Sequence, residues 1–199
     1  MKRTIYFLII INFFSYSCDK PDDTAELTPP SVDTLVTYVI KQGNHYAEQS
    51  GLQLMNKTAI VAHVTFDSSA IYTSVDPVNQ ADVNKLIGFS DCGTDHQQNS
   101  ARLGWSWNGS ELILYAYAYV NSQRIIKTLG PVPLLQPINC SVNATDNYYY
   151  FKVSDHIDSI PRHCIGYTGV GYKLYPYFGG DEVAPHEVRI AILEEPTTP

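Results

Sequence analysis

The sequence predicts an all-β protein, a two-sheet antiparallel β-sandwich, and three observations support this fold class. From Val32 onward, apolar and polar residues alternate with a period of two, the pattern of strands with one buried face. The chain is rich in Tyr, Thr, Val, Ile and Gly, and charged residues make up 17% of it, a composition typical of β-rich domains. Turn residues separate the alternating runs, as expected for strands joined by short connections.

Each alternating run is expected to form one strand. Asn108-Gly109 and Asn121-Ser122 lie between consecutive runs and suit two-residue hairpin turns, which need positive φ angles. Only the segment 80–88 has a short helical pattern. We expect strands at 35–41, 59–67, 100–108, 110–120, 123–129, 148–154, 171–178 and 187–194.

The N-terminus carries an export signal. Lys2 and Arg3 precede an apolar run that ends at Phe14, and small residues then lead to Cys18. The run is too short to cross a bilayer as a helix. It resembles a bacterial lipoprotein signal, in which the cysteine receives the lipid (palmitate) and becomes the mature N-terminus. Ordinary secretory cleavage nearby is the alternative.

The segment after Cys18 is a predicted tether. Residues 18–31 include four acidic residues and three prolines, so they cannot bury enough apolar surface to fold. We therefore expect a signal peptide at 1–17, a disordered tether at 18–31 and a β-sandwich domain at 32–195. The lipid on Cys18 would hold the protein in the bacterial outer membrane, exposed at the cell surface. A periplasm-facing anchor is the alternative.

Charge and cysteine content exclude several classes of function. The formal net charge of −7 repels nucleic-acid phosphates, so we expect no nucleic-acid partner. If Cys18 carries a lipid, Cys92, Cys140 and Cys164 remain, and at most one disulfide forms within the chain, with its pairing left open. The sequence has no Cys-x-x-Cys motif, so a structural zinc site is not expected.

An aromatic stripe is the sharpest local pattern. Between Leu112 and Val120, the apolar residues at even positions are expected to face the core, while Tyr115, Tyr117 and Tyr119 face the other way. Trp105 lies on the preceding run, which would be the neighbouring strand. The four aromatic side chains could form a stacking platform for sugar rings, or the stripe could simply stabilise cross-strand pairs.

A polar stretch leads into the strand that bears Trp105. His96, Asn99 and Arg102 supply donors and acceptors that could orient a sugar or a carboxylated polymer. Oxygen donors such as Asp91 would also suit Ca²⁺, but the spacing matches no defined calcium loop, so no cofactor is expected. His63 lies on a predicted strand and could form a proton-transfer pair with a stripe tyrosine.

The strand and turn layout resembles the concanavalin A-like jelly roll, and several strings are similar to those of small bacterial surface lipoproteins of uncharacterised function. The resemblance covers roughly residues 36–194 and implies fold more than function, because this architecture carries lectins, glycoside hydrolases and polysaccharide lyases. The strings are Gly43-Asn-His-Tyr46, Phe66-Asp-Ser-Ser-Ala-Ile-Tyr72, Asn84-Lys-Leu-Ile-Gly-Phe-Ser-Asp-Cys92, Ser100-Ala-Arg-Leu-Gly-Trp105 and Tyr175-Pro-Tyr-Phe-Gly-Gly-Asp-Glu-Val-Ala-Pro-His186.

Enzyme motifs of this fold are absent from the sequence. Laminarinase-like hydrolases carry Glu-x-Asp-x-x-Glu on one strand, because two carboxylates must act from the same face. No such string occurs here. Alginate-lyase-like members carry Gln-x-His and an Arg-rich strand, and here only Tyr172-Lys173 is similar to their Tyr-x-Lys motif.

We therefore expect a non-catalytic, membrane-anchored carbohydrate-binding protein whose ligand is a polysaccharide. The expected contacts are Trp105, Tyr115, Tyr117 and Tyr119 for stacking, with His96, Asn99 and Arg102 as polar contacts. One alternative is a polysaccharide lyase or glycoside hydrolase that uses the same groove, with His63 and a stripe tyrosine as base and acid. A second alternative is an accessory or scaffold lipoprotein whose aromatic face binds another protein.

Overall fold

The structure, a computed structural model, describes residues 34–55, 57–164 and 170–196 of the 199-residue chain. The predicted signal peptide (1–17), Cys18 and the predicted tether (18–31) lie outside the described residues. The domain is a two-sheet antiparallel sandwich, which confirms the predicted fold class. Within the described ranges, no helix is long and apolar enough to cross a membrane.

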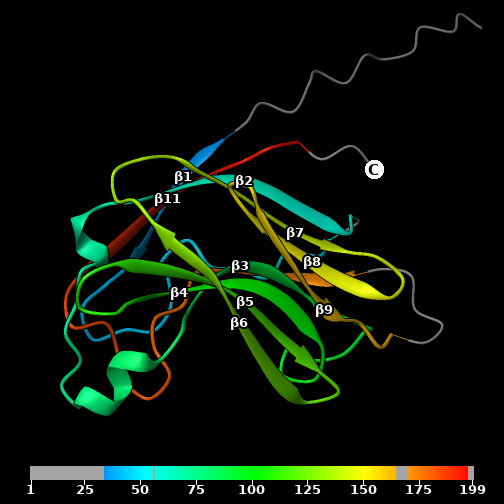
Figure 1. Ribbon diagram of the computed structural model, residues 1–199, viewed down its shortest axis with the longest axis horizontal. Helices are drawn as coiled ribbons and strands as arrows, with labels where there is room; N and C mark the ends of the chain where they lie inside the picture. Colours follow the sequence, from blue (N-terminus) through cyan, green and yellow to red (C-terminus); the bar gives the residue numbers. More distant parts are fainter. Residues whose placement is uncertain (1–33, 56, 165–169, 197–199) are drawn as a thin grey trace, which may run out of the picture. The chain divides into compact units, whose positions relative to one another are not determined.

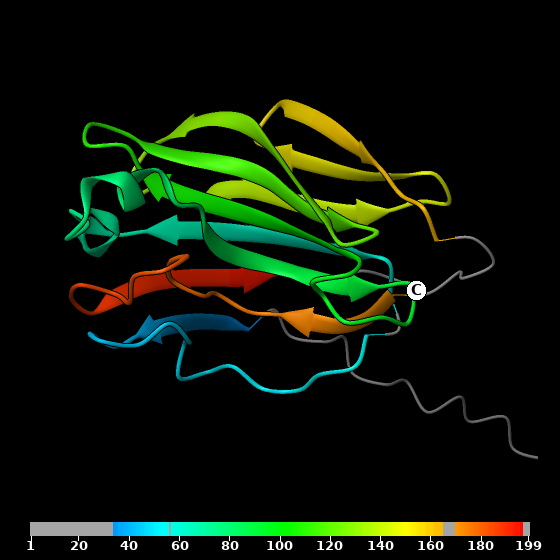
Figure 2. The same cartoon turned by 90° about the horizontal axis from the view of Figure 1, so that it is seen from below.

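Two sheets face each other across the core (Figure 1). One has six strands in the order β1-β11-β2-β7-β8-β9, and the other has five in the order β10-β3-β4-β5-β6. Every neighbouring pair of strands is antiparallel. Figure 2 shows the domain from the side of the five-stranded sheet, with β10 (orange) beside β3. The strands are β1 Leu35–Ile40, β2 Ala59–Phe66, β3 Asn84–Asp91, β4 Ser100–Trp107, β5 Leu112–Val120, β6 Gln123–Val132, β7 Ile138–Ala144, β8 Tyr148–Val153, β9 His156–Pro161, β10 Val170–Leu174 and β11 Val188–Glu194.

The alternating pattern predicts most of these strands at nearly the observed positions. β7 and β9 are missing from the predicted strands. β7 does alternate, with the buried residues Ile138, Cys140 and Val142 separated by Asn and Ser, so its own pattern would have supported a strand. β9 lies at the edge of its sheet, and most of its residues are exposed or half-buried. β7 is paired on both sides, with β2 and β8, whereas β9 pairs with β8 alone.

The helix predicted at 80–88 is wrong. A short 3₁₀ turn, Pro77–Ala81, is followed by β3, which begins at Asn84. β3 is a central strand whose residues are buried on both faces from Leu86 to Asp91. A strand covered on both faces has no polar side, so period-two alternation disappears and the sequence resembles a short helix.

The hairpin between β5 and β6 has the predicted two-residue turn. Asn121 and Ser122 have φ angles of 51° and 66°, in the left-handed region that this turn requires. The connection between β4 and β5 is longer than predicted. There the Asn108 side-chain oxygen accepts hydrogen bonds from the backbone N–H groups of Ser110 and Glu111, and Gly109 has a φ of 99°.

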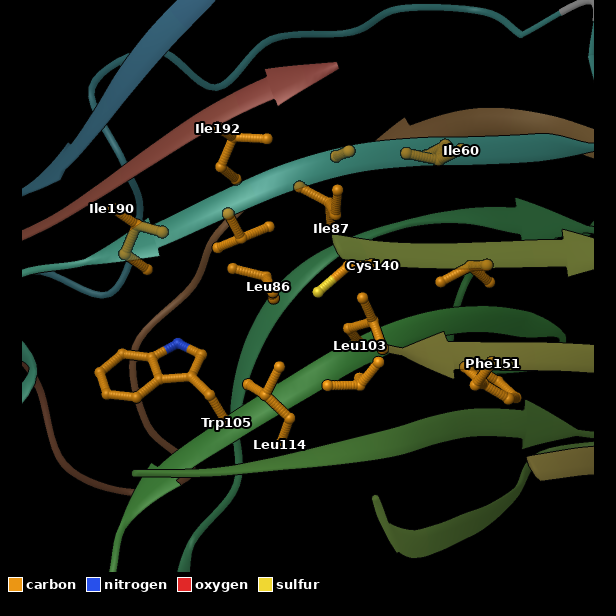
Figure 3. Packing of buried hydrophobic residues seen from close by; sticks show 14 of the residues in the cluster. Ile60, Leu86, Ile87, Leu103, Trp105, Leu114, Cys140, Phe151, Ile190 and Ile192 are labelled. Carbon is orange, nitrogen blue, oxygen red and sulfur yellow. The ribbon is translucent and has the colours of Figure 1, made fainter. Parts of the chain in front are cut away.

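The core lies between the sheets and takes side chains from both of them. Figure 3 shows Trp105 of β4 among core residues such as Leu86 of β3, Leu114 of β5 and Ile190 of β11. Trp105 is 0% exposed. The prediction that it stacks on a sugar is therefore wrong, because its register partner is Leu114, which also faces the core. The indole contributes to core packing instead, and the centre of its ring lies 5.4 Å from that of the Phe66 ring.

A disulfide and a buried ion pair join the ends of the two sheets. Cys92, directly after β3, is bonded to Cys164, which follows β9, and Cys140 is a buried free thiol. This agrees with the prediction of at most one disulfide. Beside it, Arg162 donates two hydrogen bonds to the fully buried Asp91 carboxylate, at 2.6 and 2.9 Å. Asp91, the suggested calcium donor, is thus a structural anchor.

Candidate functional site

A cavity of about 630 Å³ opens on the face of the five-stranded sheet that points away from the core. Its base is built by register: Arg102 of β4 is directly opposite Tyr117 of β5, and Tyr119 of β5 is opposite Arg124 of β6. These four side chains alternate with core residues along their strands, so they all project to the outer face. We call this cavity the groove. The other polar and aromatic side chains that line it are Tyr46, Ser50, Lys85, His96, Gln97, Lys173, Tyr175, Tyr177 and Asp181.

Arg102 lies at the base of the groove. Only 7% of it is exposed, and its Nε atom is buried with no hydrogen-bond partner among the described residues. Its guanidinium carbon lies 5.5 Å from the centre of the Tyr117 ring. Burial lowers the pKa of Arg102, but a guanidinium keeps its charge at neutral pH. A buried cation of this kind is stabilised by any anion that enters the groove.

Lys85 brings a second cation to the same place. Its Nζ lies 5.5 Å from the centre of the Tyr117 ring and 5.6 Å from that of Tyr177, and it donates a hydrogen bond to the Gly179 carbonyl at 2.6 Å. Burial, with a further contribution from Arg102, lowers the pKa of Lys85 to about 8, although Asp82 opposes the shift. Lys85 is thus mainly charged at neutral pH and can lose its proton at mildly alkaline pH.

The tyrosine stripe faces outward as predicted, but its members differ. Tyr117 is 3% exposed, and burial raises its pKa to about 12, so it offers a protonated hydroxyl rather than an open ring face. Tyr119 lines the groove beside it, with the two ring centres 5.9 Å apart. Tyr115 lies outside the groove lining and its hydroxyl is 3.0 Å from that of Ser106. A flat stacking platform of Tyr115, Tyr117 and Tyr119 is therefore not present.

The loop from Asp91 to Ser100 provides one wall of the groove. His96 and Gln97 line the cavity, and the Nδ1 of His96 lies 3.0 Å from the Tyr172 hydroxyl. Burial, with Arg102 as the second cause, lowers the pKa of His96, so the ring is neutral at neutral pH. A role for His96 in ligand contact remains a prediction.

Two predicted site residues lie elsewhere. Asn99 is buried and accepts a hydrogen bond from the Asn121 backbone N–H at 2.9 Å, while its amide donates to Thr94. It therefore fixes the loop rather than reaching a ligand. His63 lies on β2 of the six-stranded sheet, where its Nε2 lies 2.8 Å from a carboxylate oxygen of Glu195. The predicted pairing of His63 with a stripe tyrosine is wrong, because the two belong to different sheets.

Four Lys and Arg side chains line the groove, and three of them differ from the cations elsewhere on the sandwich because they have no carboxylate partner in the part of the chain that the structure describes. The fourth, Lys173, pairs with Glu194. Lys41, Lys127, Arg162 and Arg189 each contact a carboxylate within 3.2 Å. Among the described residues, no carboxylate forms a salt bridge with Lys85, Arg102 or Arg124. The groove therefore concentrates positive charge on a chain whose net charge is −7.

Comparison with known proteins supports the fold assignment. No protein-family model matches the sequence, and no curated protein matches it either. Among solved structures, alginate lyase AlyC3 matches with a TM-score of 0.57 and 10% identity over 81% of this chain and 74% of that one. Carbohydrate-binding module CBM66 from Bacillus subtilis matches with a TM-score of 0.41 and 7% identity (82% and 89% covered). A β-1,3-1,4-glucanase (lichenase) from a mouse hindgut metagenome matches with a TM-score of 0.41 and 13% identity (82% and 80%).

These similarities are at the level of fold. The similarity to the alginate lyase, together with the two antiparallel sheets, shows that the chain has a jelly-roll sandwich fold. Function has to be argued from the groove itself.

Proposed function

We propose that the groove binds an acidic polysaccharide and that a carboxylate or sulfate group of the ligand contacts Arg102 and Lys85. The observation that carries this proposal is the guanidinium of Arg102, which lines the groove, is 7% exposed and forms no salt bridge with a carboxylate among the described residues. A cation largely removed from water gains from a charge-assisted hydrogen bond to an anion. Neighbouring tyrosine hydroxyls and Gln97 supply donors for sugar hydroxyls.

The polymeric nature of the ligand is supported by the shape of the site and by the fold. The groove extends across β3, β4, β5 and β6, from Asp181 at one side to Arg124 at the other. A space of about 630 Å³ holds more than a simple anion. The alginate lyase that shares this fold is named for an acidic polysaccharide.

A binding panel tests this proposal. The purified protein is titrated with alginate, polygalacturonate and heparin, and with neutral glucans as controls. We expect retention of at least one acidic polymer, with an affinity that falls as salt rises, because screening weakens the contacts with Arg124 and Lys85. Equal affinity for the neutral glucans, or no binding to any acidic polymer, would overturn the proposal.

A second candidate function, β-elimination on a uronate chain, is favoured by the lowered pKa of Lys85. In this reaction Arg102 neutralises the carboxylate, which acidifies the hydrogen on the adjacent carbon. Neutral Lys85 takes that proton, and the electron pair forms a carbon–carbon double bond as the bond to the glycosidic oxygen breaks. The leaving oxygen receives a proton from Tyr117, whose hydroxyl is protonated at neutral pH. The Lys85 ammonium then restores the tyrosine proton through water.

Lyase activity has a direct assay. Each cleavage produces one unsaturated uronate, which absorbs ultraviolet light, and one new hydroxyl end. If the groove is catalytic, the rate per bound substrate rises as pH passes through about 8, since the base must be neutral, and Lys85→Gln abolishes it. Binding without unsaturated product at any pH would leave the protein as a binder.

We also infer that the protein is an exported lipoprotein anchored through Cys18 and exposed on the outer membrane. The Cys92–Cys164 disulfide supports export, because disulfides persist in oxidising compartments. Incorporation of labelled palmitate into the full-length protein, and its loss in Cys18→Ala, is the expected result. Unlabelled wild-type protein released in soluble form would contradict the inference.

A further inference from the structure

An exposed pair of aromatic rings lies at the mouth of the groove. Tyr46 lines the groove and is 67% exposed. Its ring meets that of Tyr177 edge to face, with ring centres 4.9 Å apart and an interplanar angle of 86°. The Tyr177 ring also stacks on the His45 ring, with ring centres 5.0 Å apart and an interplanar angle of 8°. Tyr46 therefore presents an open aromatic surface, which Tyr117 at the groove base does not.

The backbone holds this pair in place. The His45 carbonyl accepts a hydrogen bond from the Phe178 N–H at 2.8 Å, and the Asn44 carbonyl accepts one from the Ala184 N–H at 3.0 Å. Tyr46 and Tyr177 also form an isolated β-bridge. A ring that is already fixed loses little conformational entropy when a ligand stacks on it, so this exposed aromatic is preorganised for binding.

A continuous series of contacts connects the pair to the cations. Lys85 Nζ lies between the rings of Tyr177 and Tyr117, 5.6 and 5.5 Å from their centres, and the Arg102 guanidinium lies 5.5 Å from the same Tyr117 ring. An acidic sugar bound at Arg102 and Lys85 would thus have Tyr177 and Tyr46 beside it in the direction of the groove mouth.

We propose that Tyr46 and Tyr177 form a sugar-stacking subsite next to the anion-binding position, a proposal that rests on the function proposed above. The acid group of one residue contacts Arg102 and Lys85, and the pyranose ring of the adjoining residue packs its apolar C–H face on Tyr46. Aromatic rings bind such faces through dispersion and the hydrophobic effect, with no need for charge. The subsite therefore adds affinity only for ligands longer than one sugar residue, while Arg102 and Lys85 bind the acid group of a ligand of any length.

Chain length separates the two contributions experimentally. Calorimetric titration uses tetramers of the panel polymer that binds most tightly, and the corresponding uronic acid monomer. Tyr46→Ala is expected to weaken tetramer binding by about three- to tenfold, and to leave the affinity for the monomer unchanged. Tyr46→Phe keeps the ring and should bind the tetramer like the wild type.

Tyr148→Ala is the matched control. Tyr148 is also an exposed tyrosine in contact with another tyrosine, Tyr150, but it lies on β8 of the other sheet. It should bind both ligands normally. Unchanged tetramer affinity in Tyr46→Ala, or equal loss in Tyr46→Phe, would overturn the stacking subsite. If wild-type protein binds no acidic tetramer at all, the proposed function itself fails, so the two failures are distinguishable.

Discussion

At the scale of single residues, the groove is defined by charges that the protein does not neutralise itself. Arg102 and Lys85 are near enough to influence each other, since Arg102 contributes to the lowered pKa of Lys85. Two cations facing a common space repel each other and lose hydration, so this arrangement lowers the stability of the folded protein. Destabilising charges of this kind are typical of sites that need the charge for binding.

The lowered pKa of Lys85 predicts how binding depends on pH. Lys85 is charged below about pH 8 and becomes neutral above it, because its pKa in the folded protein is lowered to about that value. Affinity for an acidic oligosaccharide should therefore fall several-fold as pH rises from neutral through about 8, with the midpoint of the change near that pKa. Titrations between neutral and alkaline pH measure this.

Lys85→Arg provides the control for that pH dependence. Arginine keeps its charge throughout the range, so the fall in affinity should be absent from this variant. A wild-type affinity that stays flat across pH 8, or the same fall in Lys85→Arg, would mean that another group titrates.

At the scale of elements, β3 and β4 place Lys85 and Arg102 next to each other. The register of this pair shifts between Lys85 and Gly88, a local irregularity of the kind produced by a β-bulge. Gly88 is directly opposite Arg102, and a Cβ at Gly88 would lie 2.1 Å from the Ala101 carbonyl oxygen. The two strands are thus closely packed just below the cationic site.

Gly88→Ala should destabilise the protein by about 2 kcal/mol or more, since the new methyl group meets backbone that cannot move freely. Gly51→Ala is the matched control: a Cβ there has no atom within 4 Å and its φ is not in the positive region, so the change should stay within about 0.5 kcal/mol. Urea denaturation of both variants measures the difference. Equal stabilities would show that β3 and β4 are not so tightly packed.

The Cys92–Cys164 disulfide acts at the same scale, because it connects the two sheets across a sequence separation of 72 residues. Restricting a loop of that size in the unfolded chain contributes about 4 kcal/mol. Reduction should lower the midpoint of thermal unfolding by roughly 10 °C. Calorimetry with and without a thiol reductant measures the shift, and an unchanged midpoint would show that the disulfide contributes nothing.

Cys140, the buried free cysteine, should stay unreactive, since burial raises the pKa of its thiol to about 12.

At the scale of the whole molecule, the sequence predicts the sandwich well and the site only in part. Strands such as β2, in which buried and half-buried residues alternate, are found readily from their period-two pattern, whereas β3, which is buried on both faces, is not. Missing β3 removes Lys85 from the predicted site. Tyr46 and Tyr177 are missed because they belong to irregular segments that meet only through the tertiary fold. The core position of Trp105 follows from its register with Leu114, which only the assembled sheet shows.

Arg102 shows the opposite case. It was expected to contact a ligand from its place in a polar stretch, and it lies at the base of the groove. The sequence alone does not reveal that it lacks a carboxylate partner, because ion pairs such as that of Arg162 and Asp91 join residues far apart in the chain. Its burial and its position opposite Tyr117 depend on the assembled sheet.

The most direct test of the central claim is calorimetric titration of Arg102→Met with an acidic tetrasaccharide. Met has a similar shape and no charge, so the variant should be at least as stable as the wild type, since a buried, unneutralised charge is removed. Its affinity should nevertheless fall by about ten- to hundredfold. Arg189→Met is the control and should bind normally, because Arg189 is an exposed, ion-paired arginine on β11 of the other sheet and does not line the groove. Wild-type affinity in a folded Arg102→Met protein would contradict the claim that this guanidinium binds the acid group.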